Sequence, residues 1–207
     1  MKKGIVTFVA ALSLVLAAGT QKSEAAAMKN FSADMVVEAE KHTSTMKFYI
    51  KADKQRMESS EHGASSIMIM RFDRKVMWMV DTANKSYMEM PVQMDHQNPV
   101  TTRGDANVKV EKKLEGTEKV DGHPTNKYFE TYYRNGKKEG AAYIWEATDL
   151  DNFPIKYQDE QKKATTTFKN IKLGDPADSL FDPPAGYQKM DMGGMMGGMG
   201  GRPHKKK

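Results

Sequence analysis

Methionine is the residue type in this chain whose number and spacing are best suited to forming a site. The 207 residues include 17 methionines and no cysteine. A thioether is a soft ligand that suits Cu(I), and methionine is also a flexible apolar side chain that adapts to irregular hydrophobic surfaces. In the central region the methionines form pairs spaced two residues apart: Met68/Met70, Met77/Met79 and Met88/Met90. Because these pairs stand among Ile, Val and Trp, the pattern favours a core or an apolar cavity over a metal site.

The C-terminal methionines have a different setting. From Met190 to Gly201 the chain is almost entirely Met and Gly, and its last residues are basic. Glycine loses much entropy on ordering and there is little here to bury, so we expect residues 190–207 to be a disordered tail. Several thioethers of such a tail could converge on one Cu(I) ion, the alternative being a tail without a function. The candidate ligands are Met190, Met192, Met195, Met196, Met199 and His204.

Catalytic motifs are missing from the sequence. It contains no Gly-x-Ser-x-Gly, no His-Glu-x-x-His and no phosphate-binding glycine loop. Its 5 histidines are scattered without metal-ligand spacing, and His62 and His123 fall in predicted turns. The lack of cysteine excludes disulfides, thiolate ligands and thiol catalysis. We therefore expect no catalytic residue and a non-enzymatic protein, with an enzyme whose site forms only in space as an alternative.

The N-terminal segment has the three parts of a secretory signal peptide. Lys2 and Lys3 are followed by an uncharged apolar run, and small residues extend to Ala27. This pattern predicts cleavage near Ala27. The apolar run is too short to cross a bilayer of about 30 Å as a helix. We expect a periplasmic or secreted protein without a stable membrane anchor.

The net charge of +5 resides at the two ends of the chain. Between residues 28 and 189 the acidic and basic residues balance. Proteins that bind nucleic acid need a basic face to neutralise phosphates, so this partner class is excluded. The three terminal lysines, 205–207, could attract anionic lipid but are too few to anchor the protein.

The region between residues 31 and 173 alternates between apolar and polar residues, the period of a strand with one buried face. Asn135-Gly136 is a strong signal for a two-residue hairpin loop. With that loop, Tyr128 is predicted opposite Tyr143 and Phe129 opposite Ala142. The predicted strands are 31–40, 45–52, 55–59, 66–72, 75–80, 86–90, 118–120, 127–133, 138–147, 153–158 and 165–173. We therefore expect one mainly β, antiparallel domain over residues 28–189.

Within two of these predicted strands, residues 67–70 and 76–80 are apolar at successive positions. Strands with one solvent-exposed face alternate between apolar and polar residues instead. Something must cover the second face of the two apolar strands. Residues 91–114 lack a strand period, so we predict that they form a helix or loop lid. If one face of these strands lines a cavity, the ligand contacts are drawn from Met68, Met70, Met77, Trp78 and Met79.

The C-terminal part of the predicted domain resembles a known family. Phe168-Lys169-Asn170-Ile171, followed by Leu180-Phe181-Asp182-Pro183-Pro184-Ala185-Gly186-Tyr187, is similar to the closing signature of bacterial envelope proteins of the LolA/LolB lipoprotein-carrier type. Segments 72–78, 81–87, 118–122 and 153–156 agree in order. The resemblance implies an antiparallel sheet curled into an incomplete barrel, with a lid over an apolar cavity. Relatives carry acyl chains or other hydrophobic ligands through the periplasm, but the branch that matches has no assigned role and no transferable site residue.

These observations favour a periplasmic carrier or chaperone-like module that binds a lipid or acyl ligand in an apolar cavity. Other envelope proteins are candidate partners. One alternative is a copper-binding envelope protein that acts through its Met-Gly tail, and the other is the enzyme named above. No cofactor is expected besides Cu(I) at the tail.

Overall fold

The computed structural model describes residues 29–40, 42–61, 64–92 and 108–190. The predicted signal peptide lies outside these residues, as does the lid segment 93–107. So do the tail positions Met192, Met195, Met196, Met199 and His204. Within the described part of the chain, no helix combines the length and hydropathy that a membrane span requires.

The described residues fold almost entirely as strands, as predicted. The strands are β1 (Phe31–Ala39), β2 (His42–Lys51), β3 (Lys54–Glu61), β4 (Ala64–Arg71), β5 (Val76–Asp81), β6 (Ser86–Pro91), β7 (Val108–Val120), β8 (His123–Arg134), β9 (Lys137–Ala147), β10 (Phe153–Asp159), β11 (Ala164–Leu173) and β12 (Gln188–Met190). One turn of 3-10 helix, η2 (Asp178–Phe181), precedes β12. The described elements group into two compact units, the first from residues 29–52 and 108–176, the second from residues 53–92 and 177–190.

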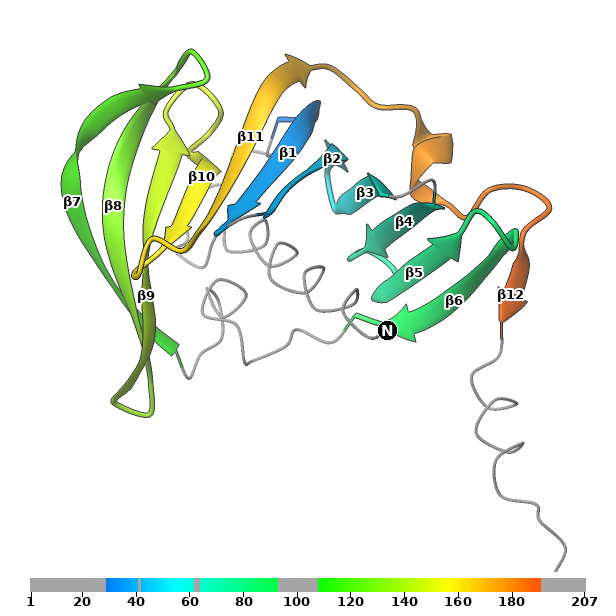
Figure 1. The fold of residues 1–207 in the computed structure, drawn as a ribbon, viewed down its shortest axis with the longest axis horizontal. Coiled ribbons are helices and arrows are strands. Elements are labelled where there is room, and N and C mark those ends of the chain that lie inside the picture. Colours follow the sequence, from blue (N-terminus) through cyan, green and yellow to red (C-terminus); the bar gives the residue numbers. More distant parts are fainter. Residues whose placement is uncertain (1–28, 41, 62–63, 93–107, 191–207) are drawn as a thin grey trace, which may run out of the picture. The chain divides into compact units, whose positions relative to one another are not determined.

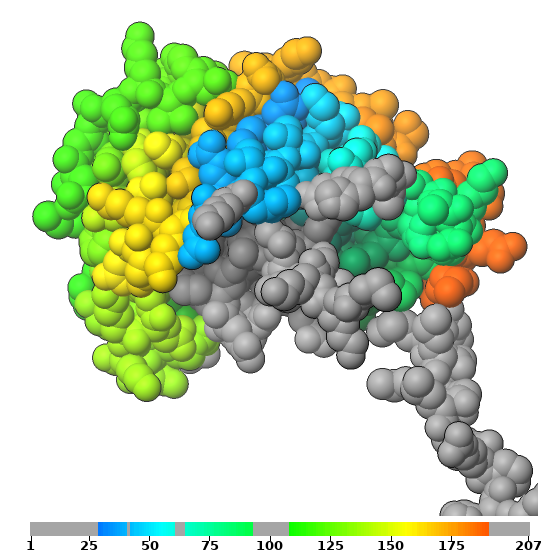
Figure 2. Space-filling model, viewed as in Figure 1, coloured from blue at the N-terminus to red at the C-terminus, as the bar shows by residue number. Residues whose placement is uncertain are grey.

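The first unit is an open antiparallel sheet with the strand order β2-β1-β11-β10-β9-β8-β7. Figure 1 shows the long bent strands β7, β8 and β9, and Figure 2 shows the surface of this unit from β1 and β2 in blue to β7 in green. Phe31, Phe48, Phe153 and Phe168 form its aromatic core, with neighbouring ring centroids 4.9 to 5.9 Å apart. Tilted and edge-to-face contacts of this kind stabilise beyond the area that they bury. The predicted mainly β, antiparallel and unclosed fold is confirmed.

The β8–β9 hairpin turns where the sequence predicts, but its register differs from the prediction. Arg134 pairs with Lys137 across Asn135 and Gly136, whose φ angles are 50° and 78°. A bulge between Tyr132 and Tyr133 then shifts the pairing. The extra residue, Glu139, stands between Lys138 and Gly140, where no apolar residues alternate and the sequence therefore does not reveal the shift. The predicted pairs are therefore wrong: Tyr128 lies opposite Ile144, and Phe129 lies opposite Tyr143.

Strand β7 corrects the predicted lid. Residues 108–114, assigned to the lid from sequence, form the first half of β7 and pair with β8. Only residues 118–120 of β7 were predicted as a strand; the rest escaped prediction because β7 is the edge of the sheet and most of its side chains are exposed, so no apolar face repeats. Its many exposed Lys and Glu residues are typical of an edge strand that resists pairing with another chain.

The second unit is also an open sheet, in the order β12-β6-β5-β4-β3. Strands β3 to β6 form an antiparallel meander, whereas β12 adds to β6 in parallel (Figure 1). The helical turn η2 contacts β3 and β4, and its Phe181 is fully buried. Met190, predicted as the first residue of the tail, belongs to β12.

Candidate functional site

Methionines from every strand of the second unit gather on one face of its sheet. The strand register places Met57, Met68, Met79, Met88 and Met190 in one row across β3, β4, β5, β6 and β12. A second row contains Met70, Met77 and Met90. Residues directly opposite in neighbouring strands share a face, with Cβ atoms about 4.5–5.5 Å apart. We call this surface the methionine face.

The methionine face changes from buried to exposed across the sheet. Met57, Met68 and Met70 are buried, whereas Met79 is 38% and Met190 is 43% exposed. Met77, Met88 and Met90 are partly buried. Thioether side chains with this much solvent contact in a packed sheet form a deformable apolar surface.

A polar row borders the methionine face on one side. The register aligns Ser59, Ser66, Asp81, Ser86 and Gln188 across the same strands. The carboxylate of Asp81 accepts hydrogen bonds from the Asn84 side chain at 2.7 Å and from the backbone N–H groups of Ala83 and Asn84. The Asn84 side chain is the main cause that lowers the pKa of Asp81 below its ordinary 3.8. The face therefore combines an apolar surface with a polar margin.

Trp78 lies on the opposite face of the sheet, because successive side chains of a strand point to opposite sides. It shares a row with Ile69 and Glu89. Its indole Nε1 donates a hydrogen bond to Glu89 at 2.9 Å, and Lys189 binds the same carboxylate at 2.6 Å. The hydrogen bond from Lys189, and next the one from Trp78, lower the pKa of Glu89.

The structure thus divides the predicted ligand residues. It brings Met68, Met70, Met77 and Met79 together on the methionine face and separates Trp78 from them. The members that the prediction missed are Met57, Met88, Met90 and Met190. The Met88/Met90 spacing was a usable signal, whereas Met57 and Met190 are identified only by the strand register.

Two buried arginines hold η2 against the sheet, on the Trp78 side. Arg56 lies opposite Ile69 and so shares the face of Trp78, and its Nη1 donates to the Leu180 carbonyl at 2.8 Å. Arg71 also faces this side, and its Nη1 donates to Asp182 at 3.0 Å and to the Phe181 carbonyl at 3.3 Å. On this side, residues 180–182 of the chain itself therefore lie against β3 and β4.

Arg71 is in turn fixed by Asp73. The two guanidinium nitrogens Nε and Nη2 donate to the two carboxylate oxygens at 2.8 and 2.7 Å. Such a bidentate pair is geometrically specific and stronger than a neutral hydrogen bond. The hydrogen bond from Arg71 lowers the pKa of Asp73.

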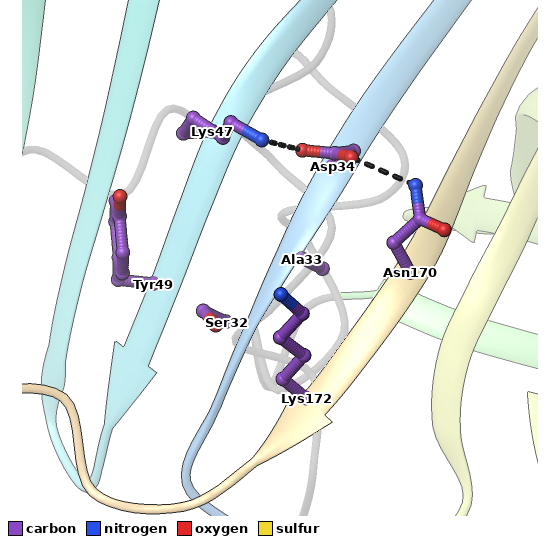
Figure 3. A pocket seen from close by; sticks show the side chains of 7 residues that line it. All are labelled: Ser32, Ala33, Asp34, Lys47, Tyr49, Asn170 and Lys172. Atoms are coloured by element: carbon purple, nitrogen blue, oxygen red, sulfur yellow. Dashed lines mark hydrogen bonds and ion pairs between the residues drawn. The ribbon is translucent and has the colours of Figure 1, made fainter.

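The first unit carries a polar hollow of about 380 Å³ over β1, β2 and β11. Figure 3 shows Asp34 between Lys47 and Asn170, at 2.5 and 2.8 Å. The Lys47 hydrogen bond is the main cause that lowers the pKa of Asp34. The other residues that line the hollow are Ser32, Ala33, Tyr49 and Lys172. A hollow lined in this way suits water or a polar group, and it offers an acyl chain little apolar surface.

Two buried carboxylates of the first unit belong to an ion-pair network. Glu130 is fully buried and accepts a hydrogen bond from the Tyr132 hydroxyl at 2.8 Å. Lys112 lies 2.6 Å from Glu146 and 3.9 Å from Glu130. Pairing in this way offsets part of the desolvation cost of the buried carboxylates. Their burial and pairing fit a structural role in the sheet better than acid–base catalysis.

Metal ligands other than methionine do not cluster within the described residues, where no three His, Asp or Glu side chains come together. Of the five histidines, only His42 and His123 belong to the described residues. His123, in a predicted turn, pairs with Asp149 at 2.9 Å. The methionine face is therefore the candidate functional site with the most distinctive chemistry.

Comparison with known proteins gives a family match and a set of similar folds. Residues 32–150 match the model of a family described as "Domain of unknown function (DUF4412)". No curated protein matches the chain.

Among solved structures, an uncharacterized conserved protein from Thermus thermophilus matches at 14% identity and a TM-score of 0.54, covering 79% of this chain and 90% of its own. A chain of the MucA/MucB complex from Pseudomonas aeruginosa matches at 15% identity and a TM-score of 0.52, covering 78% of this chain and 58% of its own. The matches also include a LolA superfamily protein from Nitrosomonas europaea, at 12% identity and a TM-score of 0.37, covering 75% and 91%. At these identities the similarity concerns the fold alone.

Proposed function

This chain belongs to the DUF4412 family, and from its methionine face we propose that it is a non-enzymatic carrier or chaperone-like protein of the cell envelope. Its proposed ligand is hydrophobic, such as the acyl chain of a lipid. One observation carries the proposal: the methionines of β3, β4, β5, β6 and β12 share a face that is partly open to solvent.

Methionine suits this role better than a branched apolar residue. Its unbranched side chain has three rotatable bonds and adjusts to ligands of different shape. A folded protein gains stability by covering apolar surface at about 25 cal/mol per Å², so exposed thioethers favour an apolar occupant. The polar row, with the exposed residues Asp81 and Gln188 at the margin, fits an amphipathic ligand, whose chain lies over the methionines and whose head group reaches the polar side chains.

The cellular setting of the proposal rests on the sequence. The signal-peptide pattern of residues 1–27 supports export to the periplasm or beyond. The likeness in fold to a chain of the MucA/MucB complex makes an envelope protein the alternative occupant. A lipid is favoured because the surface consists of adaptable side chains bordered by a polar row.

Titration of the mature protein with a fluorescent fatty acid tests the proposal. We expect Met79→Gln and Met88→Gln each to weaken binding about fivefold, since covering the remaining exposed part of one methionine contributes about 1 kcal/mol. Leu114→Gln is the matched control, because Leu114 is a 57% exposed apolar residue on β7 of the first unit.

Native mass spectrometry of the protein from its own envelope provides a second readout, in which a carried lipid appears as added mass. The proposal fails if the fatty acid does not bind, or if Leu114→Gln weakens binding as much as Met79→Gln does.

A further inference from the structure

We propose that Met79, Met88 and Met190 form a binding site for a soft monovalent metal ion, Cu(I), at the exposed end of the methionine face. The three residues come from the adjacent strands β5, β6 and β12. Met88 is the central residue, opposite Met79 on one side and opposite Met190 on the other. The site goes beyond the proposed function, since it binds an ion rather than a hydrophobic ligand.

The strand spacing brings the three thioethers within reach of one ion. Neighbouring strands lie about 4.7–4.9 Å apart, so the three side chains leave the sheet side by side on one face. Each methionine has enough rotatable bonds to turn its sulfur toward a common point without moving the backbone. The three sulfur atoms can therefore converge on one ion through rotamer changes alone.

Solvent access distinguishes these residues from the other methionines of the same row. Met79 is 38% and Met190 is 43% exposed, whereas Met57 and Met68 are 2% and 6% exposed. An ion arriving from solvent can reach the exposed end without opening the core. The inner methionines remain packing residues.

The ligand set selects a soft ion of low charge. Thioethers are neutral and soft, which favours Cu(I) over Zn²⁺, a metal that takes thiolate, imidazole or carboxylate ligands. Asp81 is the carboxylate of the polar row, and the turn engages it through Asn84 and Ala83. The chain has no cysteine to compete for the ion.

Strand β12 supplies the third ligand, and its position is well defined by contacts. The Gln188 N–H donates to the Lys85 carbonyl at 2.9 Å, and Lys189 pairs with Glu89 of β6 at 2.6 Å. These contacts hold the next residue, Met190, in register with Met88. The site therefore depends on the C-terminal strand being added to the sheet.

The test uses the full mature protein labelled with ¹³C at the methionine methyl groups. Ag(I) serves as the air-stable probe, and Cu(I) is then titrated against a chromogenic chelator. Single Met→Leu variants assign the methyl resonances. Leucine is nearly the same size, so these variants keep the apolar surface while they remove a thioether.

We expect the first equivalent of Ag(I) to shift the resonances of Met79, Met88 and Met190. Met79→Leu and Met88→Leu should each weaken Cu(I) binding about tenfold or more, since one of three ligands is lost, while Met57→Leu, the buried control, changes it little. Thermal melting confirms that the variants fold.

Fatty-acid titration of the unsubstituted protein separates this site from the proposed carrier function, because a failure to bind fatty acid would refute the carrier function and leave the Cu(I) titration unaffected. The inference is overturned if the three resonances stay fixed while other methionines shift, or if Met79→Leu and Met88→Leu bind Cu(I) as the unsubstituted protein does.

Discussion

Replacing Arg71 with Met should destabilise the second unit more than any surface charge substitution. The Arg71 side chain is 6% exposed, and its guanidinium donates to Asp73 at 2.8 and 2.7 Å, to Asp182 at 3.0 Å and to the Phe181 carbonyl at 3.3 Å. Asp73 and Asp182 are 36% and 48% exposed, so their carboxylates regain water when the arginine is lost. Breaking a fully buried ion pair costs about 3–5 kcal/mol. Because these carboxylates regain water, the loss of the Arg71 side chain should cost no more than the lower part of that range.

We estimate a loss of about 2–4 kcal/mol, which corresponds to a fall in Tm of about 5–15 °C for a chain of this size. Thermal and urea denaturation followed by circular dichroism measure it. Arg74→Met is the matched control: Arg74 also binds Asp182, at 3.1 Å, but is 54% exposed, so its loss should cost about 0–1 kcal/mol. Equal Tm values for the two variants would refute the idea that Arg71 fixes η2.

Acid adds an independent signature. The hydrogen bond from Arg71 holds the pKa of Asp73 below its ordinary value of 3.8 in the folded protein. The stabilisation from this pair is therefore complete above pH 3.8 and is lost as the pH falls through the lower folded pKa. The difference in stability between the unsubstituted protein and Arg71→Met should shrink as the pH falls below 3.8.

Other predictions address the first unit and the N-terminus. Gly136→Val should lower stability by about 1–2 kcal/mol, because Gly136 has a φ of 78°. The added side chain would meet open space, so the cost is backbone strain rather than a clash. An unchanged Tm would contradict this prediction. Phe168→Ala should cost about 3–5 kcal/mol in urea denaturation, because Phe168 is fully buried between Phe48 and Phe153; a cost below about 1 kcal/mol would show that the aromatic core can collapse. N-terminal sequencing of the exported protein should give a sequence that begins close to Met28. An exported protein that still begins with Met1 would exclude cleavage.

The strands that the sequence predicts are those with one buried face. In β1, Phe31, Ala33, Met35 and Val37 alternate with less buried residues, as the period of two requires. Strand β7 lacked this signal because its edge position exposes successive residues, such as Lys112 and Lys113, which point to opposite faces. Strand β12 was missed because it is three residues long and pairs with a strand that is distant in the chain.

The candidate site was predictable in its parts but not in its arrangement. Methionines two residues apart must share a face, and Trp78, between Met77 and Met79, must then lie on the other. Which methionines align across strands depends on turn lengths and bulges, and the bulge that displaced the β8–β9 register shows how one residue changes every pair beyond it. Met190 could be assigned to the site only after β12 was placed beside β6.

The pairing of β1 with β11 has a consequence for how the first unit folds. Asp34 and Asn170, bonded across these strands, are 136 residues apart in the chain. Closing a loop of that length costs about 4 kcal/mol of chain entropy, whereas β7 to β10 can form from local hairpins. Pairings of such long range slow folding. A chain that crosses a membrane N-terminus first would therefore present β1 with one open edge until β11 emerges, and the sheet of the first unit would be completed only near the end of translocation.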